Sequence, residues 1–160
     1  MAKHIIVVGG GASGLTAAIQ AAGRGARVTV LEHMDRVGKK ILSTGNGKCN
    51  MTNRNLTKDC YRSDNPGFPM DTIRHFSVED TLAFFEGLGI LPREKNGYIY
   101  PNSEQASSVL DALRMEAEHL GVEMVCGCHV KAVRPGRAFE VSCVQIQEGS
   151  KRPVHFTCEA

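Results

Sequence analysis

The chain has 160 residues, of which 42% are hydrophobic, and 19 Lys and Arg oppose 17 Asp and Glu to give a formal net charge of +2. This length is enough for one domain with a core of its own. The near balance of charge gives no electrostatic basis for binding nucleic acid or an anionic membrane, and no apolar run is long enough to cross a bilayer. Only Lys3 and a short apolar run precede the first glycines, which does not resemble a secretory signal, so we expect a cytoplasmic location.

The first 32 residues predict a strand, a glycine turn, a helix and a second strand. The apolar residues 5–8 lead into Gly9-Gly10-Gly11-Ala12-Ser13-Gly14, an alanine-rich helix follows, and the second strand at 28–31 ends at Glu32. Gly9, Gly11 and Gly14 occupy the glycine positions of G-x-G-x-x-G, which allow a sharp turn, a close backbone approach to a pyrophosphate, and tight packing of the helix on the sheet. This order of elements predicts a seat for a dinucleotide.

Glu32 strengthens this interpretation, because it follows Gly14 by 18 residues, near the distance expected for a carboxylate that accepts hydrogen bonds from a ribose. The same negative charge repels a 2′-phosphate and argues against NADP at this half-site. The alternative is an ordinary strand–helix–strand turn without a ligand.

Residues 33–72 contain many Gly, Asn, Asp, Lys and Pro, and we expect a loop there with at most short helical pieces. Glycines, lysines and amides concentrate in residues 38–53. Such a loop can surround a polyanion with N–H groups and cations, and its Asn side chains can hydrogen-bond the edge of a flat heterocycle. A solvated basic loop is the alternative.

Regular patterns return in residues 77–125. Ser77 with Asp80 forms a capping-box pattern before a helix that stops near 87–89, and residues 98–100 predict a short strand ended by Pro101. Asn102 or Ser103 is the expected cap of a further helix, which Gly121 closes, and residues 122–125 predict a third parallel strand.

The pattern from 126 to 160 is alternation of apolar and polar residues, which predicts an antiparallel meander. A doubly wound sheet calls for a further parallel strand after such a meander, and Ala160 comes first. We therefore expect an α/β fold that is incomplete at its C-terminus, either a fragment or a minimal domain with an unfinished sheet edge.

Three segments resemble one family of FAD-dependent oxidoreductases, the aminoacetone-oxidase-like family, which includes a flavoprotein of bacterial bile-acid metabolism. They are residues 8–15, the signature segment that combines Gly38-Lys39-Lys40 with residues 44–50, and residues 100–110 around Tyr100-Pro101-Asn102-Ser103. The resemblance implies that residues 1–160 are the N-terminal portion of a Rossmann-like FAD-binding domain with three layers. In that portion, residues 1–32 form the dinucleotide motif, 33–76 the cofactor loop, 77–125 helices and the third parallel strand, and 126–160 the meander.

The resemblance also implies a set of cofactor contacts. Gly9 forms the turn, and residues 11–14 hold the FAD pyrophosphate. Glu32 holds the adenosine ribose, with His33 beside it. The backbone of Val130 contacts the adenine. The expected contacts toward the pyrophosphate, ribitol and flavin are Gly38, Lys39, Lys40, Gly45, Asn46, Gly47, Lys48 and Asn50. Lys48 stands where many members carry Arg, so it keeps the charge without the planar fork of donors.

No catalytic residue can be named from this chain, and its cysteines and histidines match no metal spacing. A packing role for Cys49 is favoured over a redox role, because nothing nearby supplies a second thiol.

The favoured function is the FAD-binding part of an oxidoreductase that passes electrons through FAD, with NAD(P)H and a small organic substrate as partners of the intact protein. On this hypothesis the fragment by itself is not expected to be active. The alternatives are a non-catalytic FAD- or NAD-binding module and an inactive fragment.

Overall fold

The computed structural model describes residues 2–65, 67–147 and 149–160. The chain divides into two compact units, Met1–Ile41 with Leu113–Ala160, and Leu42–Ala112. We refer to them as the first and the second unit. Within the described residues, no helix is both long and apolar enough to cross a membrane.

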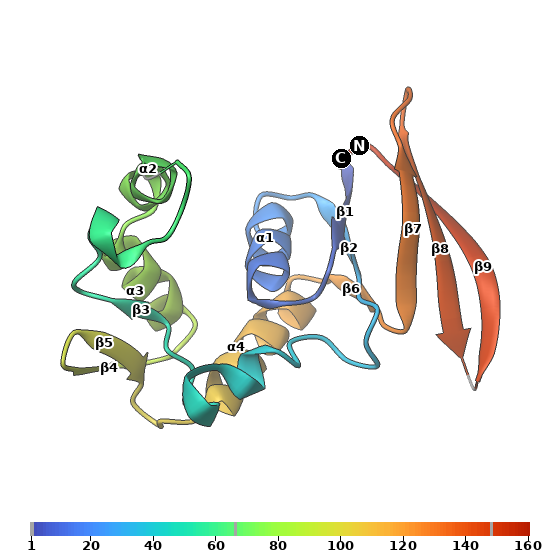
Figure 1. The fold of residues 1–160 in the computed structure, drawn as a ribbon. Helices are drawn as coiled ribbons and strands as arrows, with labels where there is room; N and C mark the ends of the chain where they lie inside the picture. The colour runs from blue at the N-terminus through green and yellow to red at the C-terminus, as the bar shows by residue number, and fades with distance from the viewer. Residues whose placement is uncertain (1, 66, 148) are drawn as a thin grey trace. The chain divides into compact units, whose positions relative to one another are not determined.

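The first unit is built on a three-stranded parallel sheet (Figure 1). Strand β2 (Arg27–Leu31) lies between β1 (His4–Val8) and β6 (Glu123–Val125), and both neighbours pair with it in parallel. The last four residues of β2 are all buried, as a central strand covered on both faces requires. The predicted parallel strands at the start of the chain and near residue 125 are confirmed.

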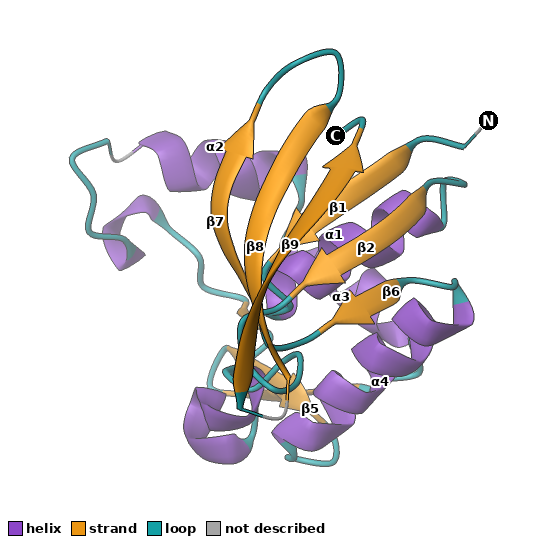
Figure 2. Ribbon diagram, turned by 90° about the vertical axis from the view of Figure 1, so that its right-hand side faces the viewer, coloured by secondary structure: helices purple, strands orange, loops and turns teal. Residues whose placement is uncertain are grey.

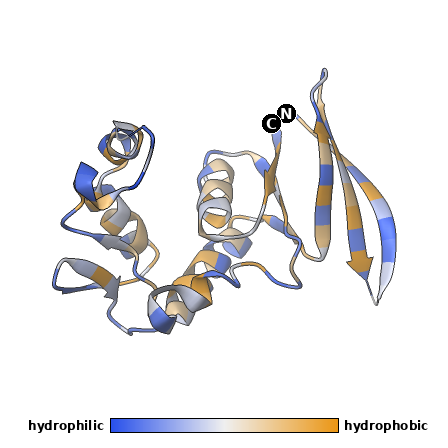
Figure 3. Cartoon of the chain, in the orientation of Figure 1, coloured by the Kyte–Doolittle hydropathy of each residue, from blue (hydrophilic) through white to orange (hydrophobic). Residues whose placement is uncertain are grey.

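Two layers cover this sheet. Helix α1 (Ala12–Ala22) packs on one face, and an antiparallel meander lies on the other (Figures 1 and 2). The meander consists of β7 (Cys128–Arg134), β8 (Phe139–Gln147) and β9 (Ser150–Cys158). The alternation that predicted it is visible along β7 and β8 in Figure 3. The predicted three-layer Rossmann-like fold is therefore confirmed.

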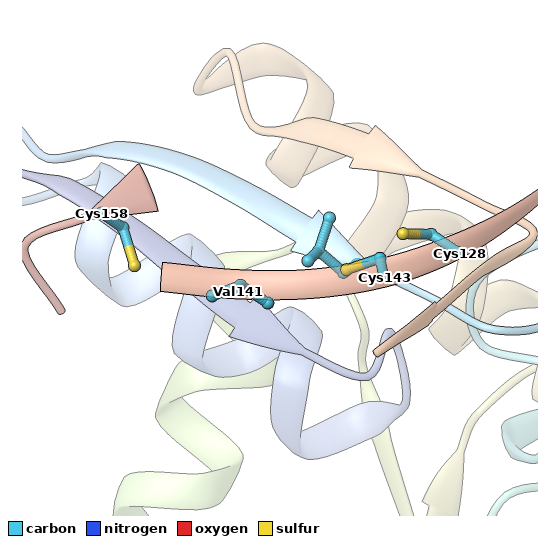
Figure 4. Close-up of a cluster of buried hydrophobic side chains, with 5 residues drawn as sticks. Cys128, Val141, Cys143 and Cys158 are labelled. Carbon is cyan, nitrogen blue, oxygen red and sulfur yellow. The ribbon is translucent and has the colours of Figure 1, made fainter. Parts of the chain in front are cut away.

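Thiols form much of the core between the meander and the parallel sheet. Cys128, Cys143 and Cys158 are buried with Leu31 and Val141 (Figure 4). All six cysteines of the chain are free thiols. Burial and the adjacent Cys143 thiol raise the pKa of Cys128 to about 12. These cysteines therefore behave as small apolar residues that fill the core.

The edge of β1 and the start of the sheet are also closed by hydrogen bonds. Residues after β9 run beside β1, where Glu159 N–H donates to the His4 carbonyl at 2.9 Å and Ile6 N–H donates to the Ala160 carbonyl at 2.9 Å. Thr29 is 2% exposed, and its hydroxyl donates to Glu123 at 3.0 Å and lies 2.9 Å from Nε2 of His4. The buried Thr29 hydroxyl in the central strand thus has hydrogen-bond partners on both sides.

The second unit contains a small antiparallel sheet with short helices. Its strands are β3 (Thr52–Asn53), β5 (Tyr98–Pro101) and β4 (Pro92–Lys95), in that order. Helix α3 (Val78–Gly87) begins with the predicted capping box, in which the Asp80 N–H donates to the Ser77 hydroxyl and the Ser77 N–H donates to the Asp80 carboxylate. Short 3-10 turns also occur in η1 (Ile41–Gly47), where non-helical backbone at Thr44, Gly45 and Asn46 forms a kink, and in η2 (Lys58–Cys60).

Three expectations for these residues need correction. Helix α2 (Gly67–His75) has 9 residues in a segment expected to be loop, and Pro69 is compatible with it because a first helical turn needs no proline N–H. Strand β4 was not expected, since its residues show no alternation of apolar and polar side chains.

The third correction concerns the start of helix α4 (Ala106–His119), for which Asn102 or Ser103 was the expected cap. Glu104 has a left-handed φ of 52°, so the chain is still turning there. The Ser103 hydroxyl accepts from Gln105 N–H at 3.3 Å in this turn, ahead of the helix.

Candidate functional site

The glycine turn joins β1 to α1 and owes its shape to two glycines. Gly9 has a φ of 97°, a conformation that side chains disfavour. A Cβ on Gly14 would lie 1.8 Å from the Gly9 carbonyl oxygen, so only glycine lets the helix approach the strand this closely. In contrast, a Cβ on Gly11 would meet nothing within 4 Å. The space beside Gly11 is therefore open to a ligand.

The N-terminus of α1 faces this open space. No side chain in the described residues caps it, and its first turn contains no acid. The first backbone bond of the ladder runs from Leu15 N–H to the Gly11 carbonyl at 2.9 Å, which leaves the N–H groups of Ala12, Ser13 and Gly14 ahead of the ladder. Together with the positive end of the helix dipole, these groups suit an anion such as a pyrophosphate.

Glu32 holds the glycine turn in place. Its side chain is buried, with one carboxylate oxygen accepting from Gly10 N–H at 2.7 Å and the other accepting from Met34 N–H at 2.8 Å. Nδ1 of His33 lies 2.9 Å from the second oxygen. Because each carboxylate oxygen can accept more than one hydrogen bond, acceptor capacity remains for a ribose hydroxyl.

Gly10 is one residue of the site that sequence reasoning missed. Its N–H binds Glu32, its carbonyl accepts from Gly38 N–H at 2.7 Å, and a Cβ on it would come within 2.5 Å of Val37. The middle residue of the triple glycine thus joins the turn to Glu32 and to the start of the signature segment. One feature of the sequence could have indicated this role, because position 10 holds a glycine although the G-x-G-x-x-G motif accepts any residue there.

A hollow of about 320 Å³ opens at the carboxyl ends of the parallel strands. We call it the strand-end hollow, and it is lined by Val8, Gly9, Leu31, His33, Cys128, His129 and Val130. It brings together three predicted contacts, Gly9, His33 and Val130, which lie far apart in the sequence. Val8 is 57% exposed here although it is apolar. The rings of His33 and His129 are 6.3 Å apart, and His129 was not predicted.

Gly38, Lys39 and Lys40 lie just beyond this turn in the first unit. Gly38 has a φ of 73° and is buried. Lys39 forms an ion pair with Asp35 at 2.7 Å, and the hydrogen bond from Lys39 is the main cause that lowers the pKa of Asp35. Part of the Lys39 charge is therefore neutralised within the loop itself.

The remaining predicted contacts, Gly45, Asn46, Gly47, Lys48 and Asn50, belong to the second unit. The chain winds tightly here. Gly45, Asn46 and Cys49 all have φ between 53° and 59°, and a Cβ on Gly45 would lie 2.9 Å from the Asn50 nitrogen. Cys49 N–H donates to the Thr44 carbonyl at 3.1 Å, and burial raises the pKa of its thiol. These facts favour the packing role predicted for Cys49.

A parallel sheet with a meander on one face, an uncapped helix behind a glycine turn and an acid after the second strand define a dinucleotide-binding domain of the kind found in flavin-dependent oxidoreductases. The cradle fits a bound pyrophosphate, because Gly11 is open and N–H groups face the space beside it. Comparison with known proteins agrees. The chain matches the HI0933-like protein Rossmann domain over residues 3–154, so it belongs to this family of FAD-binding domains.

Its relatives are longer proteins. The 3-dehydro-bile acid delta(4,6)-reductase of Clostridium scindens is 44% identical over 134 residues, which cover 82% of this chain and 33% of that protein. The ribosomal RNA dihydrouridine synthase of Haemophilus influenzae is 33% identical over 129 residues, which cover 80% of this chain and 32% of that protein. The chain thus spans about a third of the length of these curated relatives.

Solved structures share the fold at low identity. THI4 of Thermovibrio ammonificans superposes with a TM-score of 0.57 and 17% identity, covering 89% of this chain and 46% of that one. This likeness supports the Rossmann-like architecture.

Proposed function

We propose that this chain is the FAD-binding N-terminal part of a flavin-dependent oxidoreductase, in which electrons pass between a nicotinamide nucleotide and a small organic substrate. Bound FAD would supply the redox chemistry, and the residues of this chain would bind and orient it. The observation that carries the proposal is the uncapped N-terminus of α1 beside Gly11, where an added Cβ would meet no atom within 4 Å.

In the first unit, the N–H groups of Ala12, Ser13 and Gly14 would hold the pyrophosphate. Glu32 would accept from the adenosine ribose with the acceptor capacity left after Gly10 and Met34 are bound. The strand-end hollow would take the adenine, with the backbone of Val130 at its edge. The supporting facts are the volume of about 320 Å³ and the exposed apolar Val8 in its wall.

The residues of the signature segment would contact the rest of the cofactor. These are Gly38, Lys39, Lys40, Gly45, Asn46, Gly47, Lys48 and Asn50. Lysines act as point charges toward phosphate, so Lys48 would orient it less strictly than arginine does. Glu32 also disfavours a 2′-phosphate at this half-site.

The similarity to a reductase at 44% identity supports reduction of an organic substrate as the reaction of the intact protein. The second relative acts on ribosomal RNA by its name, and the net charge of +2 in this chain does not favour an RNA substrate. A non-catalytic FAD- or NAD-binding module and an inactive fragment are the remaining alternatives. The cytoplasmic location stays a prediction of the sequence.

The test is a visible absorption spectrum of the purified chain after incubation with FAD and desalting. We expect a retained flavin band, which Gly11→Ala removes while leaving the far-UV circular dichroism unchanged. Gly87→Ala is the matched control, because a Cβ there also meets nothing within 4 Å. Equal retention by Gly11→Ala and the wild-type chain would contradict the proposed pyrophosphate seat.

A further inference from the structure

A second hollow, distinct from the strand-end hollow, lies wholly within the second unit. It measures about 200 Å³ and is lined by Lys48, Lys95, Asn96, Tyr98, Tyr100 and Glu104. We call it the hairpin hollow, because the turn between β4 and β5 forms one wall. Apart from Lys48, none of these side chains belongs to the predicted set of FAD contacts.

Unusual backbone conformations gather around this hollow. In the part of the chain that the structure describes, the non-glycine residues with positive φ are Asn46, Cys49, Asn96 and Glu104, with φ between 52° and 59°. Asn96 and Glu104 line the hollow, while Asn46 and Cys49 flank Lys48. Left-handed conformations are disfavoured for side chains with a Cβ and tend to be retained at ligand sites. Asn96 and Gly97 form the two-residue turn of the β4–β5 hairpin, which requires positive φ at both positions, so this conformation fixes the shape of one wall of the hollow.

The charges of the hollow favour an anion. Glu104 faces three cations, with Nζ of Lys48 at 2.9 Å, a guanidinium nitrogen of Arg93 at 3.2 Å, and Lys95 in the same wall. The hydrogen bond from Lys48 lowers the pKa of Glu104, and Arg93 and Lys95 act in the same direction. Lys48 and Arg93 are thus paired with Glu104, and Lys95 adds a further positive charge to the wall of the hollow.

Two tyrosines add a surface for a flat ring. Tyr98 and Tyr100 lie two residues apart on β5, so both point to the same face of the strand, while Ile99 between them is 1% exposed and packs on the other face. Tyr98 is 51% exposed, and both tyrosines line the hollow. An exposed phenol ring beside cations can stack on a planar group and orient it.

We propose that the hairpin hollow binds a planar heterocycle that carries a phosphate, and that in the intact protein this ligand is the mononucleotide end of the nicotinamide electron donor. The choice of this ligand rests on the proposed function. The hollow of about 200 Å³ is smaller than typical ligand pockets of roughly 300–1,000 Å³, so it is too small for a whole dinucleotide, and only part of the ligand would be enclosed. Lys95 would bind the phosphate, and Tyr98 would stack on the ring, while Lys48 is kept for FAD.

The test is calorimetric titration of the FAD-loaded chain with nicotinamide mononucleotide, followed by nicotinamide riboside and inorganic phosphate as separate ligands. We expect the mononucleotide to bind at least about tenfold more tightly than either part, since each part lacks one of the two contacts. Because the chain has no Trp and only 3 Tyr, quenching of tyrosine fluorescence reports directly on a site lined by two of them.

Variants locate the site. Lys95→Gln and Tyr98→Ala should each weaken mononucleotide binding about tenfold, Tyr98→Phe should retain it, and Glu104→Gln should strengthen it by removing the competing carboxylate. Lys58→Gln is the matched control, an exposed lysine of the same unit outside the hollow. Unchanged binding by both Lys95→Gln and Tyr98→Ala would overturn the proposal.

Competition with FAD separates this inference from the proposed function. Mononucleotide binding that persists with FAD bound supports a separate site, and displacement of the mononucleotide by FAD would overturn it by placing the flavin cofactor in the hollow. If the chain fails to retain FAD, the FAD seat is refuted, whereas titration of the FAD-free chain with the same variants still tests the hairpin hollow.

Discussion

The two units of this chain build ligand-binding features by opposite means. In the first unit, a glycine turn, a buried carboxylate and backbone N–H groups form a closed network of short hydrogen bonds, so the predicted cofactor contacts are mostly main-chain atoms. In the second unit, exposed charged side chains surround a hollow, and residues in left-handed conformations shape the loops. Main-chain contacts depend on the fold as a whole, whereas side-chain contacts can change without changing the fold. Substitutions in the first unit should therefore cost more stability than those in the second.

The largest expected contrast is in thiol reactivity. Hydrogen bonds from Thr57 lower the pKa of the exposed Cys60 in the second unit, whereas the pKa of the buried Cys128 in the first unit is about 12. The thiolate is the reactive form and its fraction grows as pH rises through the pKa. At pH 8 we expect Cys60 to react with a thiol reagent much faster than Cys128, as measured by mass spectrometry of the labelled peptides.

Cys60→Ser should remove the fast phase of labelling and leave the slow phases unchanged. Fast modification of Cys128 or Cys143 in the folded chain would show that the meander opens readily, and would break the contrast between the units.

The next largest expected contrast is in the loss of stability when each of two glycines in the same turn is replaced by alanine. Gly14→Ala should destabilise the chain by about 3 kcal/mol, because its Cβ meets the Gly9 carbonyl oxygen, a main-chain atom that cannot rotate away. Gly11→Ala should change stability by less than about 1 kcal/mol, because its Cβ enters open space. Urea unfolding measures both, and equal effects would mean that the turn relaxes around Gly14.

Glu32→Gln should lower the free energy of unfolding by about 2 kcal/mol. The carboxylate accepts from two backbone N–H groups, whereas the amide of glutamine has one oxygen to accept from one of them and places its NH₂ group, a donor, against the other. Glu118→Gln is the control, since Glu118 forms an exposed ion pair with Arg114 at 3.6 Å and should contribute under about 0.5 kcal/mol. A loss for Glu32→Gln no greater than for Glu118→Gln would show that the network around Gly10 adds little stability.

The smallest effect concerns the capping box of α3 in the second unit. Ser77→Ala should cost about 1 kcal/mol. Hydrogen bonds from Ser77 lower the pKa of Asp80 below its ordinary 3.8. The ionised Asp80 carboxylate therefore stabilises the folded chain above pH 3.8, and this stabilisation is lost as the pH falls through the lowered pKa of the folded state. Asp80→Asn should remove this acid dependence from unfolding curves measured between about pH 2 and 6. An unchanged pH profile would contradict a role for the carboxylate.

Some features could be predicted from the sequence because they depend on local rules. The parallel strands at 4–8 and 27–31, the helix between them and the capping box at Ser77 follow from the spacing of apolar residues, glycines and caps, and the structure confirms them. The meander followed from alternation in the same way. In contrast, β4 and the nine-residue α2 have no such pattern, and packing within the second unit decides their conformation.

The sequence by itself therefore determined the class of fold and the residue types of a dinucleotide seat, since a glycine motif, a helix start and an acid act through backbone geometry within a short stretch of chain. The tertiary structure alone decided which distant residues meet. It brought His129 and Val130 to the hollow beside Gly9, bound Gly10 to Glu32 and Gly38, and turned Lys48 toward Glu104. Such contacts depend on the register of strands and the path of loops, which no local pattern encodes.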